Sequence, residues 1–73
     1  MNIQKIVGIN IRSIRNSKSI SQEKLAELSD LDRTYIHSIE KGQRNISIQV
    51  LYQISKGMGI QMEELLKDIQ YEI

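Results

Sequence analysis

The chain has 73 residues and a net charge of only +1, so its overall charge does not indicate a nucleic-acid partner. A domain of this length cannot bury a large core, and oligomerisation is a common remedy. Cysteine is absent, which excludes disulfide bonds and thiolate metal sites. No apolar run approaches the ~20 residues of a membrane span, and no signal-peptide core is present. We therefore expect one domain over residues 1–73, located in the cytoplasm, with no metal and no cofactor.

The charges are distributed unevenly along the chain. Residues 1–45 hold eight Lys and Arg against five Asp and Glu, whereas residues 46–73 hold two against four. A basic front half and an acidic rear half fit one surface that faces phosphates and another that does not.

The starts of most helices are marked by a repeated signal. Each instance has an apolar residue, a polar cap and a second apolar residue four positions beyond the cap, which is typical of an N-cap with a hydrophobic staple. The signal occurs at Ile20-Ser21-Leu25, Leu31-Asp32-Ile36, Ile46-Ser47-Leu51 and Ile60-Gln61-Leu65. Together with an initial helix, these four starts predict an all-α fold of five helices.

The predicted helices cover residues 3–17, 22–29, 48–58 and 62–68, with one more that begins after Asp32 and ends at Gly42. Gly59 is the expected stop of the fourth helix. Helical spacing also predicts which side chains point into the core. These are Val7, Ile11, Ile14, Leu25, Leu28, Ile36, Ile39, Ile48, Leu51, Ile54, Met58 and Leu65.

The segment 22–40 reads as two short helices around a tight turn, which is typical of a helix-turn-helix. Ala26 is small where the next helix must cross closely, and Asp30 stands where the turn needs a left-handed residue. The outward side of the second helix carries Arg33, Thr34, His37 and Ser38. Donors and acceptors of this length suit hydrogen bonding to base edges in a major groove.

A family resemblance rests on three short runs within residues 21–47. They are Leu31-Asp32-Arg33-Thr34-Tyr35-Ile36, Ile39-Glu40-Lys41-Gly42 and Arg44-Asn45-Ile46-Ser47. The segment resembles the XRE or Cro-like helix-turn-helix family, and within it most resembles the controller proteins of restriction-modification systems. The resemblance implies a lambda-repressor-like domain, with the helix-turn-helix at about 21–41 and a dimerisation region at about 48–73.

Roles for single residues follow from the pattern together with this resemblance. Residues expected to contact bases are Arg33, Thr34, Tyr35, His37 and Ser38. Residues expected to contact phosphates are Gln22, Lys41, Gln43, Arg44 and Asn45. His37 departs from the small residue usual in controller proteins. The resemblance also implies a structural ion pair between Arg15 and Glu40. Candidate dimer contacts are Val50, Tyr52, Met62, Leu66 and Ile69.

The resemblance implies a dimeric regulator that binds a palindromic operator of double-stranded DNA, controls a restriction-modification operon including its own gene, and contacts RNA polymerase. The alternatives are a phage-type repressor, an orphan regulator, or an antitoxin-like module that binds a protein. An enzyme is not expected, because His37 and Ser38 are adjacent on a helix and diverge by about 100°. The tail 69–73 alternates apolar and polar residues, as a strand or an extended arm does.

Overall fold

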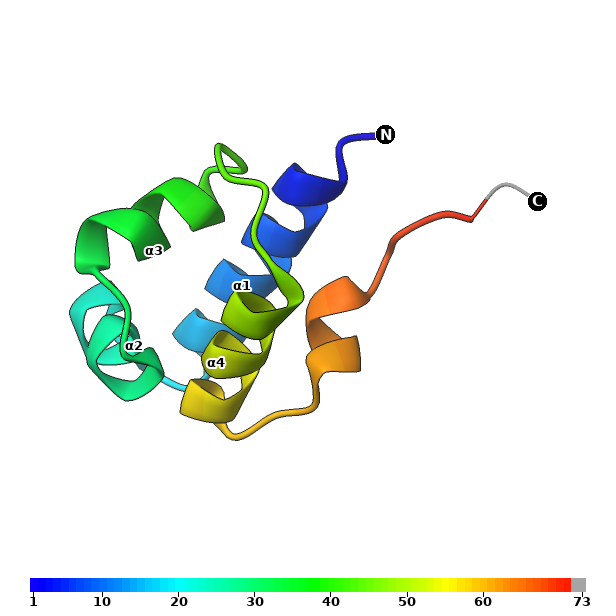
Figure 1. Ribbon diagram of the computed structural model, residues 1–73. Coiled ribbons are helices and arrows are strands. Elements are labelled where there is room, and N and C mark those ends of the chain that lie inside the picture. The colour runs from blue at the N-terminus through cyan, green and yellow to red at the C-terminus, as the bar shows by residue number, and fades with distance from the viewer. Residues whose placement is uncertain (72–73) are drawn as a thin grey trace.

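The computed structural model describes residues 1–71, which form four α-helices and one short 3-10 helix. The elements are α1 (Ile3–Ser17), α2 (Gln22–Ser29), α3 (Arg33–Glu40), α4 (Ile48–Met58) and η1 (Met62–Leu66). In Figure 1, α2 and α3 lie at one side of the molecule and the orange turn of η1 lies at the other, with α1 and α4 between them. The predicted bounds of the first, second and fourth helices are confirmed.

Side-chain caps fix where α2, α3 and α4 begin, as the repeated signal predicts. Ser21 accepts from the Lys24 N–H (3.0 Å), and Asp32 accepts from the Thr34 N–H (2.7 Å). Ser47 caps α4 in the same way, accepting from the N–H of residue 50 (3.1 Å). Each cap satisfies a backbone donor that the first turn of a helix leaves without a partner. The starts of these helices are therefore set locally.

The core is a single cluster to which every helix contributes. Its buried members are Val7, Ile11, Leu25, Ala26, Ile36, Ile39, Leu51, Ile54, Met58 and Leu65. Burying one such aliphatic side chain stabilises a fold by about 1.5–3 kcal/mol. Two isoleucines therefore anchor α3 in the core, and one leucine anchors η1.

Two residues predicted to lie in the core are exposed instead. Leu28 is 46% exposed, because the buried face of α2 is centred on Leu25, Ala26 and Ser29. Ile48 is 80% exposed at the first residue of α4, whereas Leu51 in the same turn is buried. Helical spacing predicts the direction of a side chain, but it does not predict whether another element lies there.

The fifth predicted helix is wrong in type and length. η1 is a 3-10 helix that ends at Leu66, and Lys67 after it is extended, with φ −63° and ψ 153°. The Asn10 side chain of α1 donates to the carbonyls of residues 65 (3.0 Å) and 67 (2.9 Å), so these carbonyls have a side-chain partner on another helix. A single turn anchored in this way does not need to continue as an α-helix.

Gly8 allows α1 and α3 to approach closely, a role that the sequence does not reveal. A Cβ atom at this position would lie 2.7 Å from the Glu40 carbonyl oxygen and would also clash with the Ile39 carbonyl oxygen. Both obstacles are backbone atoms at the end of α3, so they cannot rotate away. The contact fixes the distance of α3 from the body of the molecule.

After Lys67 the chain has no regular secondary structure up to Tyr71. Ile69 packs partly buried against the core, and Tyr71 is exposed. The rest of the predicted strand or arm, residues 72–73, lies outside the described residues. Among the helices of residues 1–71, not one has the length and apolar character needed to cross a bilayer.

Candidate nucleic-acid interface

The exposed side of α3 carries the centre of the predicted base-contacting set. Arg33, Thr34 and His37 are exposed, whereas Ile36 and Ile39 on the other side are buried in the core. Because the apolar side is anchored, the polar side is held out from the body of the molecule. A helix that enters a major groove needs this arrangement.

Tyr35 and Ser38, which are also expected to contact bases, are less accessible. Ser38 is half-buried, and its hydroxyl donates to the Thr34 carbonyl (3.1 Å). Tyr35 is half-buried and packs against the core, and the guanidinium of Arg44 lies 5.6 Å from the centre of its ring. This is a cation–π contact. The accessible part of the set is therefore Arg33, Thr34 and His37.

The loop after α3 holds four of the residues expected to contact phosphates. All four side chains are exposed: Lys41, Gln43, Arg44 and Asn45. Gly42 shapes this loop, because its φ of +74° lies in the left-handed region and a Cβ atom there would lie 2.7 Å from the Lys5 Cα. The loop therefore turns tightly against the start of α1 while its polar side chains stay in solvent.

Gln22, the fifth residue expected to contact phosphates, lies in the first turn of α2 and reaches α3. Its Nε2 donates to the Glu40 Oε1 (3.2 Å) and lies 3.4 Å from the His37 Nδ1. A shallow hollow between the two helices is lined by Gln22, Arg33, Thr34 and His37. The start of α2 and the exposed side of α3 thus form one continuous polar surface.

A buried ion pair lies behind this surface. The Arg15 Nε and Nη2 donate to the Glu40 Oε2 (2.6 Å) and Oε1 (3.0 Å), and the Arg15 Nη1 donates to the Ile20 carbonyl (2.8 Å). Both side chains are almost fully buried. Two parallel bonds between guanidinium and carboxylate fix direction as well as distance. The pair ties the end of α1 to the last residue of α3.

The two short helices α2 and α3 are joined by a turn with a left-handed residue, and the polar side of α3 faces outward. Asp30, the predicted turn residue, has φ 57° and ψ 46°. A family model described as helix-turn-helix (HTH_3) matches residues 11–65. The chain belongs to this helix-turn-helix family. In it, α2 and α3 are the two helices of the motif, and α3 is the one placed to enter a groove.

Similar proteins within the helix-turn-helix family include controller proteins. The chain is 52% identical to control protein C.BamHI from Bacillus amyloliquefaciens over 66 residues, which cover 89% of this chain and 82% of that protein. The crystal structure of the restriction-modification controller protein C.AhdI from Aeromonas hydrophila is 39% identical with a TM-score of 0.83, covering 85% of this chain and 94% of the other. The predicted resemblance to controller proteins is confirmed.

The restriction-modification controller protein C.Esp1396I is also similar, at 39% identity and a TM-score of 0.83, with 90% of each chain covered. Crystallised variants of that protein replace an arginine, a threonine and a tyrosine at three consecutive positions. The same three residue types in the same order begin α3 of this helix-turn-helix protein, as Arg33-Thr34-Tyr35.

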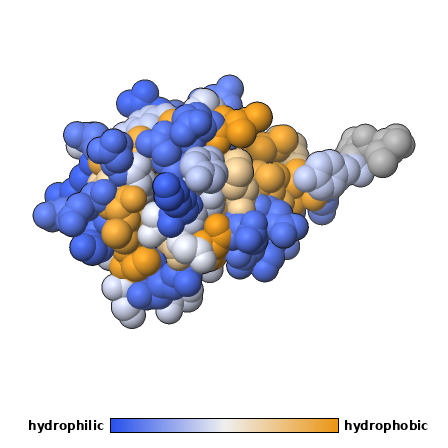
Figure 2. All heavy atoms as spheres, turned by 60° about the horizontal axis from the view of Figure 1, so that its bottom comes forward, coloured by the Kyte–Doolittle hydropathy of each residue, from blue (hydrophilic) through white to orange (hydrophobic). Residues whose placement is uncertain are grey.

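The predicted dimer contacts lie away from α3. Tyr52 and Leu66 are exposed, whereas Val50, Met62 and Ile69 are half-buried. Figure 2 shows orange, apolar residues on the side of the molecule toward the C-terminal end of the chain and a second orange patch on the opposite side, while blue, hydrophilic residues cover much of the rest of this view.

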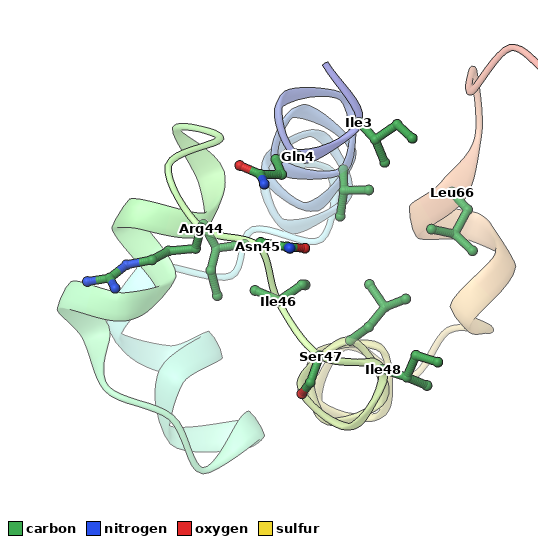
Figure 3. A pocket seen from close by; sticks show the side chains of 11 residues that line it. Ile3, Gln4, Arg44, Asn45, Ile46, Ser47, Ile48 and Leu66 are labelled. Atoms are coloured by element: carbon green, nitrogen blue, oxygen red, sulfur yellow. The ribbon is translucent and has the colours of Figure 1, made fainter. Parts of the chain in front are cut away.

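Two exposed isoleucines that sequence reasoning did not assign to an interface lie near these residues. Ile3 and Ile48 line a hollow of about 140 Å³ together with Leu66. Figure 3 shows these three side chains, from α1, α4 and η1, around the hollow, while the Arg44 side chain extends away from it over α3. The signal that could have revealed Ile3 is its place outside the inward stripe of the first helix. We call Ile3, Ile48 and Leu66 the apolar rim.

Proposed function

We propose that this protein is a dimeric, sequence-specific DNA-binding regulator of transcription that controls a restriction-modification operon, including its own gene. The observation that supports this most directly is the exposed polar side of α3, Arg33, Thr34 and His37, held out by buried Ile36 and Ile39. The similar controller proteins indicate the kind of operon. The proposed activity is binding without a chemical reaction, and it takes place in the cytoplasm.

In a dimer, each α3 would enter one of two successive major grooves. The operator would then be a palindrome whose half-sites are about 34 Å apart, one turn of the duplex. Such a protein can act on its own promoter as an activator when little is bound and as a repressor when more is bound, and activation would include a contact with RNA polymerase.

The test is fluorescence anisotropy with the duplex immediately upstream of the gene, compared with a scrambled duplex at two salt concentrations. We expect tighter binding to the natural duplex, and a preference that persists at the higher salt because base contacts release no counterions. Equal, salt-sensitive binding to both duplexes would contradict sequence-specific recognition and would favour a protein partner for the acidic rear half.

Arg33→Ala should weaken binding to the natural duplex by about 1–3 kcal/mol and relax the preference at one base position. Arg33 is exposed at the first residue of α3, where a guanidinium can donate to two acceptors of guanine. Anisotropy with duplexes substituted at each position measures this. A loss of equal size on natural and scrambled DNA would show that Arg33 contacts only phosphate.

Arg44→Ala should weaken binding to all sequences alike and flatten the dependence of log K on log salt by about one charge. Arg44 is exposed in the loop after α3 and lies over the Tyr35 ring, which orients its guanidinium. Lys67→Ala is the matched control, because it removes the same charge beyond η1. A changed base preference in Arg44→Ala, or an equal effect of Lys67→Ala, would contradict a phosphate contact.

The second copy of the dimer would pack against the apolar rim and the predicted contacts Val50, Tyr52, Met62 and Ile69. The apolar rim of this face is exposed, and η1, which carries Leu66, lies on the side away from α2 and α3 (Figures 1 and 3), whereas Tyr52 lies beside the end of α2. Both recognition helices would then remain free to meet DNA.

Ile48→Glu should convert the dimer to monomers, because a carboxylate would be buried in an apolar interface without a partner. Size-exclusion chromatography with light scattering measures the mass. Ile9→Glu is the matched control, since Ile9 is also an exposed isoleucine but does not line the hollow. A dimer that persists in Ile48→Glu would place the interface elsewhere, and a monomeric wild-type protein would favour an antitoxin-like module that lacks its partner.

A further inference from the structure

The orientation of the Gln22 amide is fixed by the buried ion pair. Glu40 receives two hydrogen bonds from Arg15, and an ionised carboxylate can only accept. The Gln22 atom 3.2 Å from the Glu40 Oε1 must therefore be the donor, the NH₂ group, and not the amide oxygen. The reverse orientation would bring two acceptors together. Gln22 therefore presents a donor toward α3.

This donor in turn selects a form of His37. The His37 Nδ1 lies 3.4 Å from the same Gln22 Nε2. An NH₂ group has two hydrogens and no acceptor, so the contact is favourable only when Nδ1 carries the lone pair. In the neutral imidazole the proton then resides on Nε2. The ring is left with a single polar group for an outside partner, and that group is a donor.

We propose that Gln22 holds His37 as an Nε2–H donor, so that His37 selects a base with a major-groove acceptor and excludes cytosine at one operator position. This inference rests on the proposed DNA-binding function. Guanine, adenine and thymine each present an acceptor in the major groove, whereas cytosine presents only the N4 donor. His37 is exposed on α3 beside Arg33 and Thr34, so its ring lies within the surface that would face the bases. Gln22 is a positioning residue that acts through His37.

The experiment uses a duplex selected by the full-length wild-type protein from a pool of random sequence. Each position of that duplex is then changed to all four bases, and anisotropy gives the ratio of affinities. At one position we expect the wild type to disfavour cytosine by roughly 5- to 150-fold, the range of a single mismatch. His37→Ala should abolish this discrimination against cytosine. Gln22→Met, which keeps the length of the side chain but has no donor, should reduce it at the same position.

The double variant Gln22→Met/His37→Ala should show no change at this position beyond that of His37→Ala, because Gln22 has no ring left to orient. Gln49→Met, the same substitution at an exposed glutamine of α4, is the matched control and should leave the ratio unchanged. Because each ratio compares the affinities for two bases at one position, a uniform loss of affinity from a missing phosphate contact of Gln22 does not change it. Effects of Gln22→Met and His37→Ala at different positions, or effects that add, would overturn the proposal.

A second measurement needs no DNA. The chain has one histidine, so the ¹⁵N signals of an imidazole ring come from His37 alone. In alkaline buffer we expect the Nε2–H form in the wild type and a larger share of the Nδ1–H form in Gln22→Met. A wild-type ring protonated on Nδ1 would overturn the inference and leave the proposed function intact. Failure of the wild type to enrich any duplex would overturn both.

Discussion

Glu40→Ala should destabilise the fold by about 3–5 kcal/mol, because it leaves the Arg15 guanidinium buried without its carboxylate. Domains have roughly 0.05–0.15 kcal/mol of stability per residue, so this loss is a large part of the total for a chain of this length. Urea unfolding followed by circular dichroism measures it, as a lower midpoint at unchanged slope.

The control for Glu40→Ala is Glu27→Ala on α2. Glu27 pairs with Lys24 at 3.3 Å, but both side chains are largely exposed. Surface pairs of this kind contribute about 0–1 kcal/mol. Similar midpoints for the two variants would show that the buried pair between α1 and α3 contributes no more than a surface pair.

Gly8→Ala should also destabilise the protein, although helix propensity predicts the opposite. In an open helix this change stabilises by about 1 kcal/mol. Here the added methyl group would lie 2.7 Å from the Glu40 carbonyl oxygen, and backbone atoms cannot rotate away. Separating α1 from α3 should cost about 1–3 kcal/mol, which lowers the melting temperature by about 4–8 °C for each kcal/mol.

Ser13→Ala is the control for Gly8→Ala, because Ser13 is an exposed residue of the same helix. It should melt at or slightly above the wild-type temperature. Thermal unfolding by circular dichroism compares the three proteins. A Gly8→Ala variant as stable as Ser13→Ala would mean that α1 and α3 can move apart at no cost.

The local features of the fold could be predicted from the sequence. Caps such as Ser21, Asp32 and Ser47 act within one turn of a helix, so the starts of three helices follow from a few neighbouring residues. The left-handed turn at Asp30 is local as well. The exposure of Leu28 and Ile48, and the shortness of η1, depend on which elements lie nearby. Spacing along one helix does not contain that information.

The candidate site also combines features that the sequence predicts with features that depend on how the helices are assembled. The polar side of α3 follows from helical spacing, because Ile36 and Ile39 must face inward. The contact between Gln22 and His37 joins residues fifteen positions apart, and it depends on a turn and on a buried carboxylate. The close approach at Gly8 likewise requires the end of α3 to be in place. Such contacts become visible only when the helices are assembled.

The two hydrogen bonds of Asn10 have a consequence for the order in which the contacts of the fold form. They join α1 to carbonyls 55 and 57 residues later, whereas α2 and α3 contact each other across a short turn. Contacts between near neighbours form faster than contacts across long loops. The contacts between α2 and α3 can therefore form before η1 docks on α1. A chain that stops short of Leu65 would leave the core open on one side, because Leu65 is the only buried core residue that η1 supplies among the described residues.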